Sequence, residues 1–265
     1  MDLTFDRVLT INLIGTTLVF YVAARFYLLP RLKRLRPSSI LVPVLLVIVT
    51  GLIATEAIAG NSDCDARLAL GPPTRDALLQ ARWREVSDAG QIYVYNRKAE
   101  GSPICEVMAR SRIAAEPQTV FRVVTDFAHY TEFMPYTAMC RVERATASEF
   151  WVYQRLEFPF ISNRHFVVKV VLHPCNGIAG FHGTVWHQDN EFAMPPDDTG
   201  AIQPRVNSGS WELWPAGNGR ETEAVYYLHS DPGGALPAFL ANLVNRRALP
   251  EVIRAVSQRC REARN

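Results

Sequence analysis

Six histidines are the residues with the most versatile chemistry in this 265-residue chain, because histidine serves both metal sites and acid–base catalysis. Their spacing provides neither an HxH nor an HExxH motif. His182 and His187 are five positions apart, so on a regular strand they face opposite sides of the sheet. We therefore expect no metal site and no cofactor.

Two further motifs resemble those of known active sites but lie in turn-like surroundings. Residues 198–200 spell DTG, the triplet of aspartic proteases, without a flanking apolar strand or a second copy, which favours a plain turn. Gly177, Gly180 and Gly183 have GxxGxxG spacing but lie in a predicted hairpin rather than a phosphate loop. The sequence contains no GxSxG nucleophile motif. No motif indicates catalysis, so we expect a protein that is not an enzyme.

The five cysteines all follow residue 60, at positions 64, 105, 140, 175 and 260. No two of them form a CxxC motif, which removes the best support for a zinc ribbon or a thioredoxin-like site. The odd number leaves at least one thiol unpaired within the chain. The sequence does not assign a pairing, and buried free cysteines are as good an interpretation as any single disulfide.

The charge balance gives no reason to expect a nucleic-acid partner. The chain has 28 Lys and Arg residues against 26 Asp and Glu residues, and 48% of it is hydrophobic. This composition excludes a disordered chain and allows one or two domains with a real core. The charge is uneven, since residues 1–59 carry six basic and three acidic side chains.

Two apolar runs in this N-terminal part predict a membrane anchor over residues 1–60. Residues 8–29 contain only one charge, Arg25, and residues 40–55 contain none. Each run is long enough to cross a bilayer as a helix. The four charges of the loop between them are positive, which places that loop in the cytoplasm. We therefore expect a bacterial inner-membrane protein whose C-terminal domain lies in the periplasm.

Two other interpretations of the same residues remain open. Residues 31–59 resemble a signal peptide, with a basic start, an apolar run and a cleavage site near Ala59, which would release the protein into the periplasm. Alternatively, the apolar runs are buried helices of a soluble protein. The first two interpretations agree that residues 60–265 work outside the cytoplasm.

Residues 61–74 are a polar linker, and residues 75–265 are predicted to form one α+β domain. We expect a helix from the N-cap Thr74 to about Val86 and a second helix over 115–135 with Pro117 in its first turn. An amphipathic helix is expected over 236–264, kinked at Pro250. Alternating patterns predict an antiparallel series of strands at 92–99, 104–114, 139–146, 149–158, 164–173, 180–188, 207–215 and 223–230.

Three stretches of this domain resemble the START domain, the StAR-related lipid-transfer fold of the helix-grip or Bet v 1-like superfamily. The first begins at WELWP (211–215), passes through DPGG (231–234) and ends in the C-terminal helix. The second is FPFISNRHFVV (158–168), which has His165 where the family usually has Asp. The third is the helix and turn at 116–135.

This resemblance implies a helix-grip fold over about residues 75–262, with a curved antiparallel sheet around the long C-terminal helix. It also implies an apolar tunnel between sheet and helix that holds a lipid-sized ligand. The loop Phe158–Asn163 and the helix itself would be the lids. Most members of this family bind or carry lipids, whereas some relatives in the superfamily cyclise polyketides.

Candidate ligand-binding residues lie on these elements. Arg155 or Gln154 would hold a polar ligand head, unless the side chain is solvated or paired across strands. Arg164 matches a family position and would pair with Glu157 or with a ligand carboxylate. Large amphipathic side chains that point inward would shape the cavity. The predicted set is Tyr136, Tyr153, Arg155, Arg164, Phe166, Trp186, Trp211, Tyr226, Phe239 and Leu243.

The function expected from these observations is binding or transfer of a lipid or other hydrophobic small molecule by a membrane-tethered domain. Two alternatives use the same fold. A cyclase or hydrolase would need a histidine and an acid or tyrosine converging in the cavity. An interaction module would have a filled cavity and an exposed apolar patch.

Overall fold

The computed structural model describes residues 64, 68, 69 and 71–263, apart from 89, 160, 174, 197 and 198. The predicted membrane anchor and most of the linker therefore lie outside the described residues. Within the described part, no helix combines the length and the apolar character that crossing a membrane requires.

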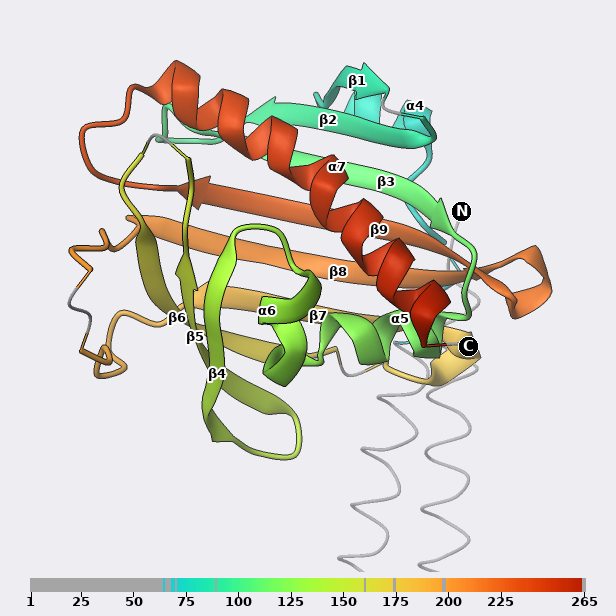
Figure 1. Ribbon diagram of the computed structural model, residues 1–265. Coiled ribbons are helices and arrows are strands. Elements are labelled where there is room, and N and C mark those ends of the chain that lie inside the picture. Colours follow the sequence, from blue (N-terminus) through green and yellow to red (C-terminus); the bar gives the residue numbers. More distant parts are fainter. Residues whose placement is uncertain are drawn as a thin grey trace, which may run out of the picture. The chain divides into compact units, whose positions relative to one another are not determined.

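The described residues contain one sheet of nine antiparallel strands in the order β1-β2-β3-β9-β8-β7-β6-β5-β4 (Figure 1). All eight strands predicted from alternation are confirmed to within two or three residues, and β1 is an additional edge strand. The pairing of β3 with β9 joins the beginning of the sheet to its end. The bounds are β1 Arg84–Asp88, β2 Ile92–Lys98, β3 Cys105–Ile113, β4 Thr137–Ala145, β5 Glu149–Leu156, β6 Arg164–Leu172, β7 His182–Gln188, β8 Val206–Ala216 and β9 Glu221–Asp231.

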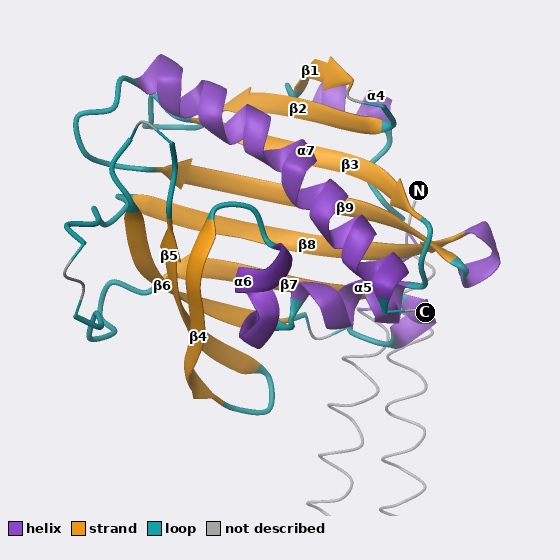
Figure 2. Ribbon diagram, viewed as in Figure 1, coloured by secondary structure: helices purple, strands orange, loops and turns teal. Residues whose placement is uncertain are grey.

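The long helix α7 (Ala238–Glu262) crosses one face of this sheet, and α5 (Pro117–Val124) and α6 (Tyr130–Phe133) cover the same face beside it (Figure 2). This arrangement confirms the predicted α+β fold with a long C-terminal helix. The helix α7 continues through Pro250, whose ring is buried. Other short helices in the described part are α4 (Arg75–Gln80), η2 (Phe127–His129), η3 (Ile178–Gly180) and η4 (Gly217–Gly219).

The first predicted helix is shorter than expected. Thr74 caps α4 as predicted, since its Oγ1 accepts a hydrogen bond from the Ala77 amide at 3.2 Å. The helix ends at Gln80 because Arg82 adopts a left-handed conformation with φ of 64°. This turn buries Trp83, whose ring packs edge-on against Tyr227, and directs the chain into β1. Tertiary packing of one tryptophan thus overrides the local helix pattern.

The second predicted helix is divided into α5, η2 and α6. Pro117 occupies the first turn of α5, as expected. The helix ends after Val124, and the Thr125 hydroxyl donates a hydrogen bond to the Phe121 carbonyl at 2.8 Å. The break lets Phe127 and Tyr130 turn inward, and the Tyr130 hydroxyl donates to the Val124 carbonyl. Burial of these two rings decides where the helix stops.

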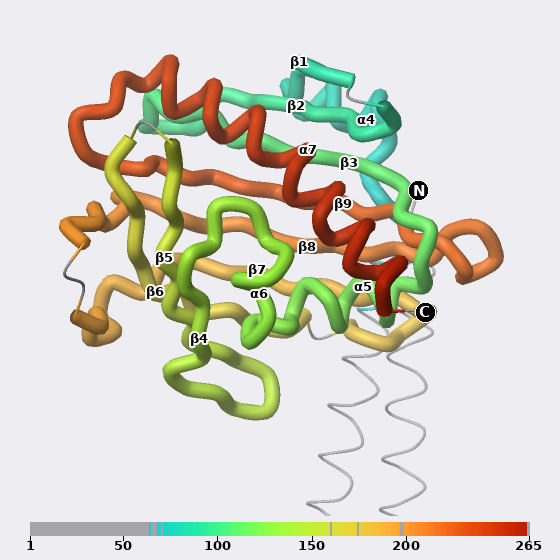
Figure 3. Tube along the Cα trace, in the orientation of Figure 1, coloured from blue at the N-terminus to red at the C-terminus, as the bar shows by residue number. Residues whose placement is uncertain are grey.

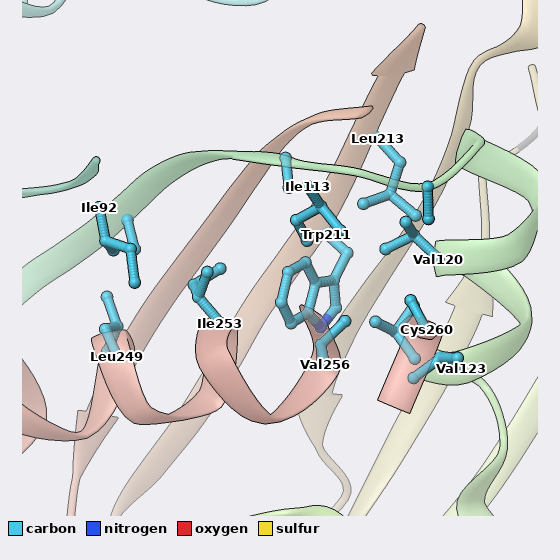
Figure 4. Close-up of a cluster of buried hydrophobic side chains, with 14 of the residues drawn as sticks. Ile92, Ile113, Val120, Val123, Trp211, Leu213, Leu249, Ile253, Val256 and Cys260 are labelled. Carbon is cyan, nitrogen blue, oxygen red and sulfur yellow. The ribbon is translucent and has the colours of Figure 1, made fainter. Parts of the chain in front are cut away.

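Two clusters of buried apolar side chains lie between the sheet and the helices. In the larger one, Leu249, Ile253 and Val256 of α7 point toward strand residues that include Trp211 and Leu213 (Figure 4). The smaller one joins Phe127 and Tyr130 to the inward side chains of β5 and β6, which are Val152, Phe166, Val168 and Val170. The space between the two clusters is where a cavity remains.

A disulfide between Cys64 and Cys175 attaches the segment before α4 to the turn after β6. It is buried in a third apolar cluster with Phe181, Trp214 and Val225 on the other face of the sheet. Within the described part of the chain, Cys105 and Cys140 are free thiols, and Cys260 is buried in the larger cluster beneath α7. The sequence left this pairing open because spacing does not reveal it.

We expect His182 to make the domain less stable in mild acid. Its ring packs against Phe121 with centroids 4.9 Å apart, and burial lowers the pKa of its imidazole below 6.5. As the pH falls below about 6.5, the unfolded chain binds a proton at this position before the folded chain does, so the free energy of unfolding decreases. Urea unfolding at pH 7.5 and 5.5 should show a smaller decrease for His182→Gln than for the natural protein. Equal decreases would contradict this role.

Candidate ligand-binding cavity

A cavity of about 180 Å³ lies between the inward face of strands β5 to β9 and the middle of α7. Its walls come from both apolar clusters, since Trp211 and Leu249 of the larger cluster and Phe127, Tyr130 and Phe166 of the smaller one line it. Ligand sites for drug-sized molecules usually measure about 300–1,000 Å³. An engineered cavity of about 150 Å³ binds benzene. As it stands, the cavity therefore has room for one or two rings or a short chain.

None of the described residues that line the cavity carries a charge at neutral pH. The lining is mainly aliphatic and aromatic, with a few amides and hydroxyls among the apolar groups. A charged ligand group would lose its hydration there without gaining a countercharge. The lining residues are Val124, Phe127, Tyr130, Met134, Pro135, Tyr136, Thr137, Gln154, Leu156, Phe158, Phe166, Val168, Val170, Thr184, Trp186, Asn207, Trp211, Tyr226, Leu228, Ser230, Val244, Asn245, Ala248, Leu249 and Val252.

Several polar groups of the lining have hydrogen-bonding capacity to spare. The side chains of Gln154, Thr184 and Tyr226 have no hydrogen-bond partner among the described residues. The Asn207 amide accepts a bond from the Trp186 indole at 3.3 Å, and Asn245 donates to the Ser230 carbonyl at 2.8 Å. These groups supply donors and acceptors for an uncharged ligand.

Three aromatic rings on adjacent strands stack within the cavity wall. Trp211 on β8 and Tyr226 on β9 face each other in register, with ring centroids 4.4 Å apart. Trp186 on β7 stacks on the same tyrosine at 5.7 Å. It passes over Gly209, where a Cβ atom would overlap the Trp186 ring and a backbone oxygen. Glycine within a strand commonly marks such a close approach, so this residue is a sequence signal for the stack.

At one end of the cavity, Tyr136 connects the start of β4 to α7. Its hydroxyl donates a hydrogen bond to Glu251 at 2.6 Å, and its ring packs on Phe158 with centroids 4.9 Å apart. The hydrogen bond to the carboxylate is the main reason why the pKa of Tyr136 is raised. Tyr136 has a left-handed backbone with φ of 62°, a conformation uncommon for large side chains.

The structure brings five of the ten predicted site residues to the cavity: Tyr136, Phe166, Trp186, Trp211 and Tyr226. Two others lie on the opposite face of β5. Tyr153 is buried beside Trp151 and Val167, and Arg155 forms an ion pair with Glu157 at 3.3 Å. Strand alternation explains this placement. The side chain of Gln154 lines the cavity, so its neighbours Tyr153 and Arg155 point to the opposite face.

Arg164 lies outside the lining and has a structural role. Its side chain is buried and donates hydrogen bonds to backbone carbonyls of two segments. One segment is the β5–β6 loop, through Ser162, and the other follows β9, through Pro232 at 2.6 Å and Gly233 at 3.4 Å. Both segments lie at the same end of the sheet (Figure 3). Arg164 therefore holds together the two loops that border the cavity, and no pairing with Glu157 is seen among the described residues.

The two predicted residues of α7 also lie outside the lining. Phe239 is 70% exposed, and Leu243 is half-buried. Phe239 and Leu243 are four positions apart and so share one side of α7, whereas the residues of α7 that line the cavity, from Val244 to Val252, lie on another side. The prediction missed three polar residues of the lining, Thr184, Asn207 and Ser230. Each lies on the same face of its strand as an aromatic residue that was predicted.

Comparisons with known proteins agree with this geometry. A family model described as polyketide cyclase, dehydrase and lipid transport matches residues 113–257, which is more than half of the chain. An uncharacterized protein from Pseudomonas aeruginosa is 24% identical over 165 residues, which are 62% of this chain and 79% of that protein.

Solved START structures share the fold. A StAR-related lipid transfer protein fragment from Xanthomonas axonopodis is 27% identical with a TM-score of 0.60, covering 68% of this chain and 98% of that fragment. Human StAR-related lipid transfer protein 5 is 14% identical with a TM-score of 0.63, covering 78% of this chain and 99% of that protein. The chain thus belongs to the family of polyketide cyclases, dehydrases and lipid-transport proteins, and its described part is a START-like helix-grip domain.

Proposed function

We propose that the domain binds an uncharged hydrophobic small molecule, or the apolar part of a lipid, in the cavity beneath α7 and carries it without chemical change. The observation that carries this proposal is the lining, in which apolar side chains surround a few neutral polar groups. Apolar contact would supply the affinity at about 25 cal/mol per Å² of buried surface. The neutral polar groups would orient the ligand.

The size of the cavity supports a ligand with one or two rings or a single short chain. A two-chain lipid would need the β5–β6 loop to separate from α7 and from the segment after β9. Tyr136 packs on Phe158 of that loop and bonds to Glu251 of α7, and Arg164 joins the loop to Pro232, so these contacts would have to break first. Exchange of a larger ligand would therefore be slow compared with that of a small one.

The ionisable groups of the cavity favour binding over catalysis. Among the described residues, three tyrosines line the cavity, Tyr130, Tyr136 and Tyr226, and the pKa of each is raised. Burial is the main cause for Tyr130 and Tyr226, and the Glu251 hydrogen bond is the main cause for Tyr136. Groups with such high pKa values exchange protons poorly at neutral pH. This supports the proposal that the protein is not an enzyme.

We also propose that the domain works outside the cytoplasm, with residues 1–60 as its membrane tether in a bacterial envelope. The buried Cys64–Cys175 disulfide supports this location, because such bonds form and persist in oxidising compartments. A tether would keep the domain close to the bilayer from which hydrophobic ligands come.

Mass spectrometry of molecules that co-purify with the full-length chain tests the binding proposal. We expect a neutral hydrophobic compound in stoichiometric amount, and Gln154→Glu should reduce it about tenfold or more because it buries a charge beside the ligand. Phe239→Glu is the matched control, since the same carboxylate at an exposed position should leave the ligand bound. Equal amounts in both variants, or no neutral compound in any preparation, would refute the proposal.

A further inference from the structure

We propose that the Tyr226 hydroxyl is the hydrogen-bond anchor for the ligand, and that the ligand carries an uncharged oxygen, such as a hydroxyl or carbonyl, to meet it. This inference rests on the proposed function and adds to it a specific contact and a chemical class. It begins from the rarity of a phenol in a protein interior whose hydroxyl has no partner.

The neighbouring hydroxyls show the contrast. Tyr130 donates to the Val124 carbonyl, Tyr136 donates to Glu251, and Tyr227 donates to Glu106 at 3.0 Å. Tyr226 lines the cavity, and its hydroxyl has no hydrogen-bond partner among the described residues. Burial alone raises its pKa, so the group is a neutral phenol at any physiological pH. A neutral phenol can donate one hydrogen bond and accept another.

The wall holds this hydroxyl in one place before any ligand arrives. The Tyr226 ring stacks on Trp211 at 4.4 Å and on Trp186 at 5.7 Å, so both indoles restrict its rotation. Trp186 can reach it only because Gly209 leaves the intervening strand surface clear. The Trp186 indole is itself fixed by its bond to Asn207. Such preorganisation lowers the entropy lost when a ligand binds.

The surroundings determine which oxygen fits. The described lining provides no cation to neutralise a carboxylate or phosphate, which argues against an anionic group at this position. Thr184 and Gln154 also line the cavity with free hydrogen-bonding groups and can share the same ligand oxygen or a second one. A hydroxyl or carbonyl on an apolar skeleton satisfies these groups without leaving a buried charge.

Three matched probes test the contact: naphthalene, 2-naphthol and 2-naphthoate. Naphthalene has no polar group, 2-naphthol carries one neutral hydroxyl, and 2-naphthoate carries one charged carboxylate. Binding to the full-length chain is measured by equilibrium dialysis, for the natural protein and for Tyr226→Phe. The variant keeps the stacked ring and removes one oxygen. We expect it to weaken 2-naphthol about tenfold, as loss of one net hydrogen bond does, and to leave naphthalene unchanged.

The outcomes separate the contact from the proposed function. If Tyr226→Phe leaves the affinity ratio of 2-naphthol to naphthalene unchanged, the anchor is wrong and the uncharged cavity stands. If 2-naphthoate binds as well as 2-naphthol, or if no probe binds, the proposed function fails. Trp186→Leu keeps the Tyr226 hydroxyl but removes one ring that restricts it. If preorganisation matters, this variant should lower the affinity ratio of 2-naphthol to naphthalene. An unchanged ratio in this variant would remove the positioning role of Trp186.

Discussion

Replacing both Cys64 and Cys175 by alanine is expected to lower the free energy of unfolding by about 4 kcal/mol, because the disulfide closes a loop with a sequence separation of 111 residues. Without the bond, the unfolded chain gains the conformational freedom that this closure removes. The two sulfurs also lie in an apolar cluster with Phe181 and Trp214, so their loss leaves part of that cluster poorly packed. Urea unfolding followed by tryptophan fluorescence measures the change.

Reduction separates the covalent bond from the packing. A thiol reductant should destabilise the natural protein by nearly the same amount and have no further effect on the double alanine variant. Cys105→Ala is a control, because this thiol is free and only half-buried in the structure. If the natural protein is equally stable with and without reductant, the disulfide does not contribute as expected.

Most strands follow from the sequence because alternation requires only local information. The strand β6 shows this, since Phe166, Val168 and Val170 occupy the inward parity throughout. Likewise, Trp211 and Leu213 share one face of β8 while Trp214 packs on the other, as alternation predicts. Alternation alone does not say which face points toward α7, because both faces of β5 carry bulky apolar side chains, Val152 on one and Tyr153 on the other.

The elements that sequence patterns misjudge depend on contacts between distant residues. The end of α4 is set by Trp83 packing on Tyr227, and the break after α5 is set by Phe127 and Tyr130 packing on β5 and β6. A helical pattern contains no information about such partners. The pairing of Cys64 with Cys175 is unpredictable for the same reason, since it joins segments that become neighbours only in the folded sheet.

Most of the predicted residues that line the cavity are large side chains on correctly assigned strands. The weaker inferences relied on residue type, as with Arg155, or on a family position, as with Arg164. Val152 points toward the cavity side of β5. Because side chains alternate along a strand, Gln154 then points inward and Arg155 outward. Polar residues on the inward face, such as Thr184 and Asn207, can be found from strand alternation in the same way.

Arg164→Leu is expected to lower the free energy of unfolding by about 3 kcal/mol, because it removes a buried side chain that donates to the carbonyls of two loop segments. Arg164 is 3% exposed, and its guanidinium reaches Ser162 on one side and Pro232 on the other. A lysine at this position cannot span both segments with one ammonium group, so Arg164→Lys should recover only part of the loss. Urea unfolding gives the stabilities, and hydrogen exchange should show faster opening at residues 157–163 and 231–237.

A nearby arginine provides the contrast that this prediction needs. Arg205 pairs with Asp231 at 3.6 Å, but its side chain is 69% exposed, so Arg205→Leu should change stability by less than about 1 kcal/mol. Equal effects of the two leucine variants would mean that Arg164 is an ordinary surface charge. If the larger effect is found, one residue couples the β5–β6 loop, which carries Phe158, to the end of β9, which carries Ser230. Because Phe158 and Ser230 both line the cavity, replacing Arg164 should also speed ligand release. The stability of the domain and the rate of ligand exchange would then depend on the same contact.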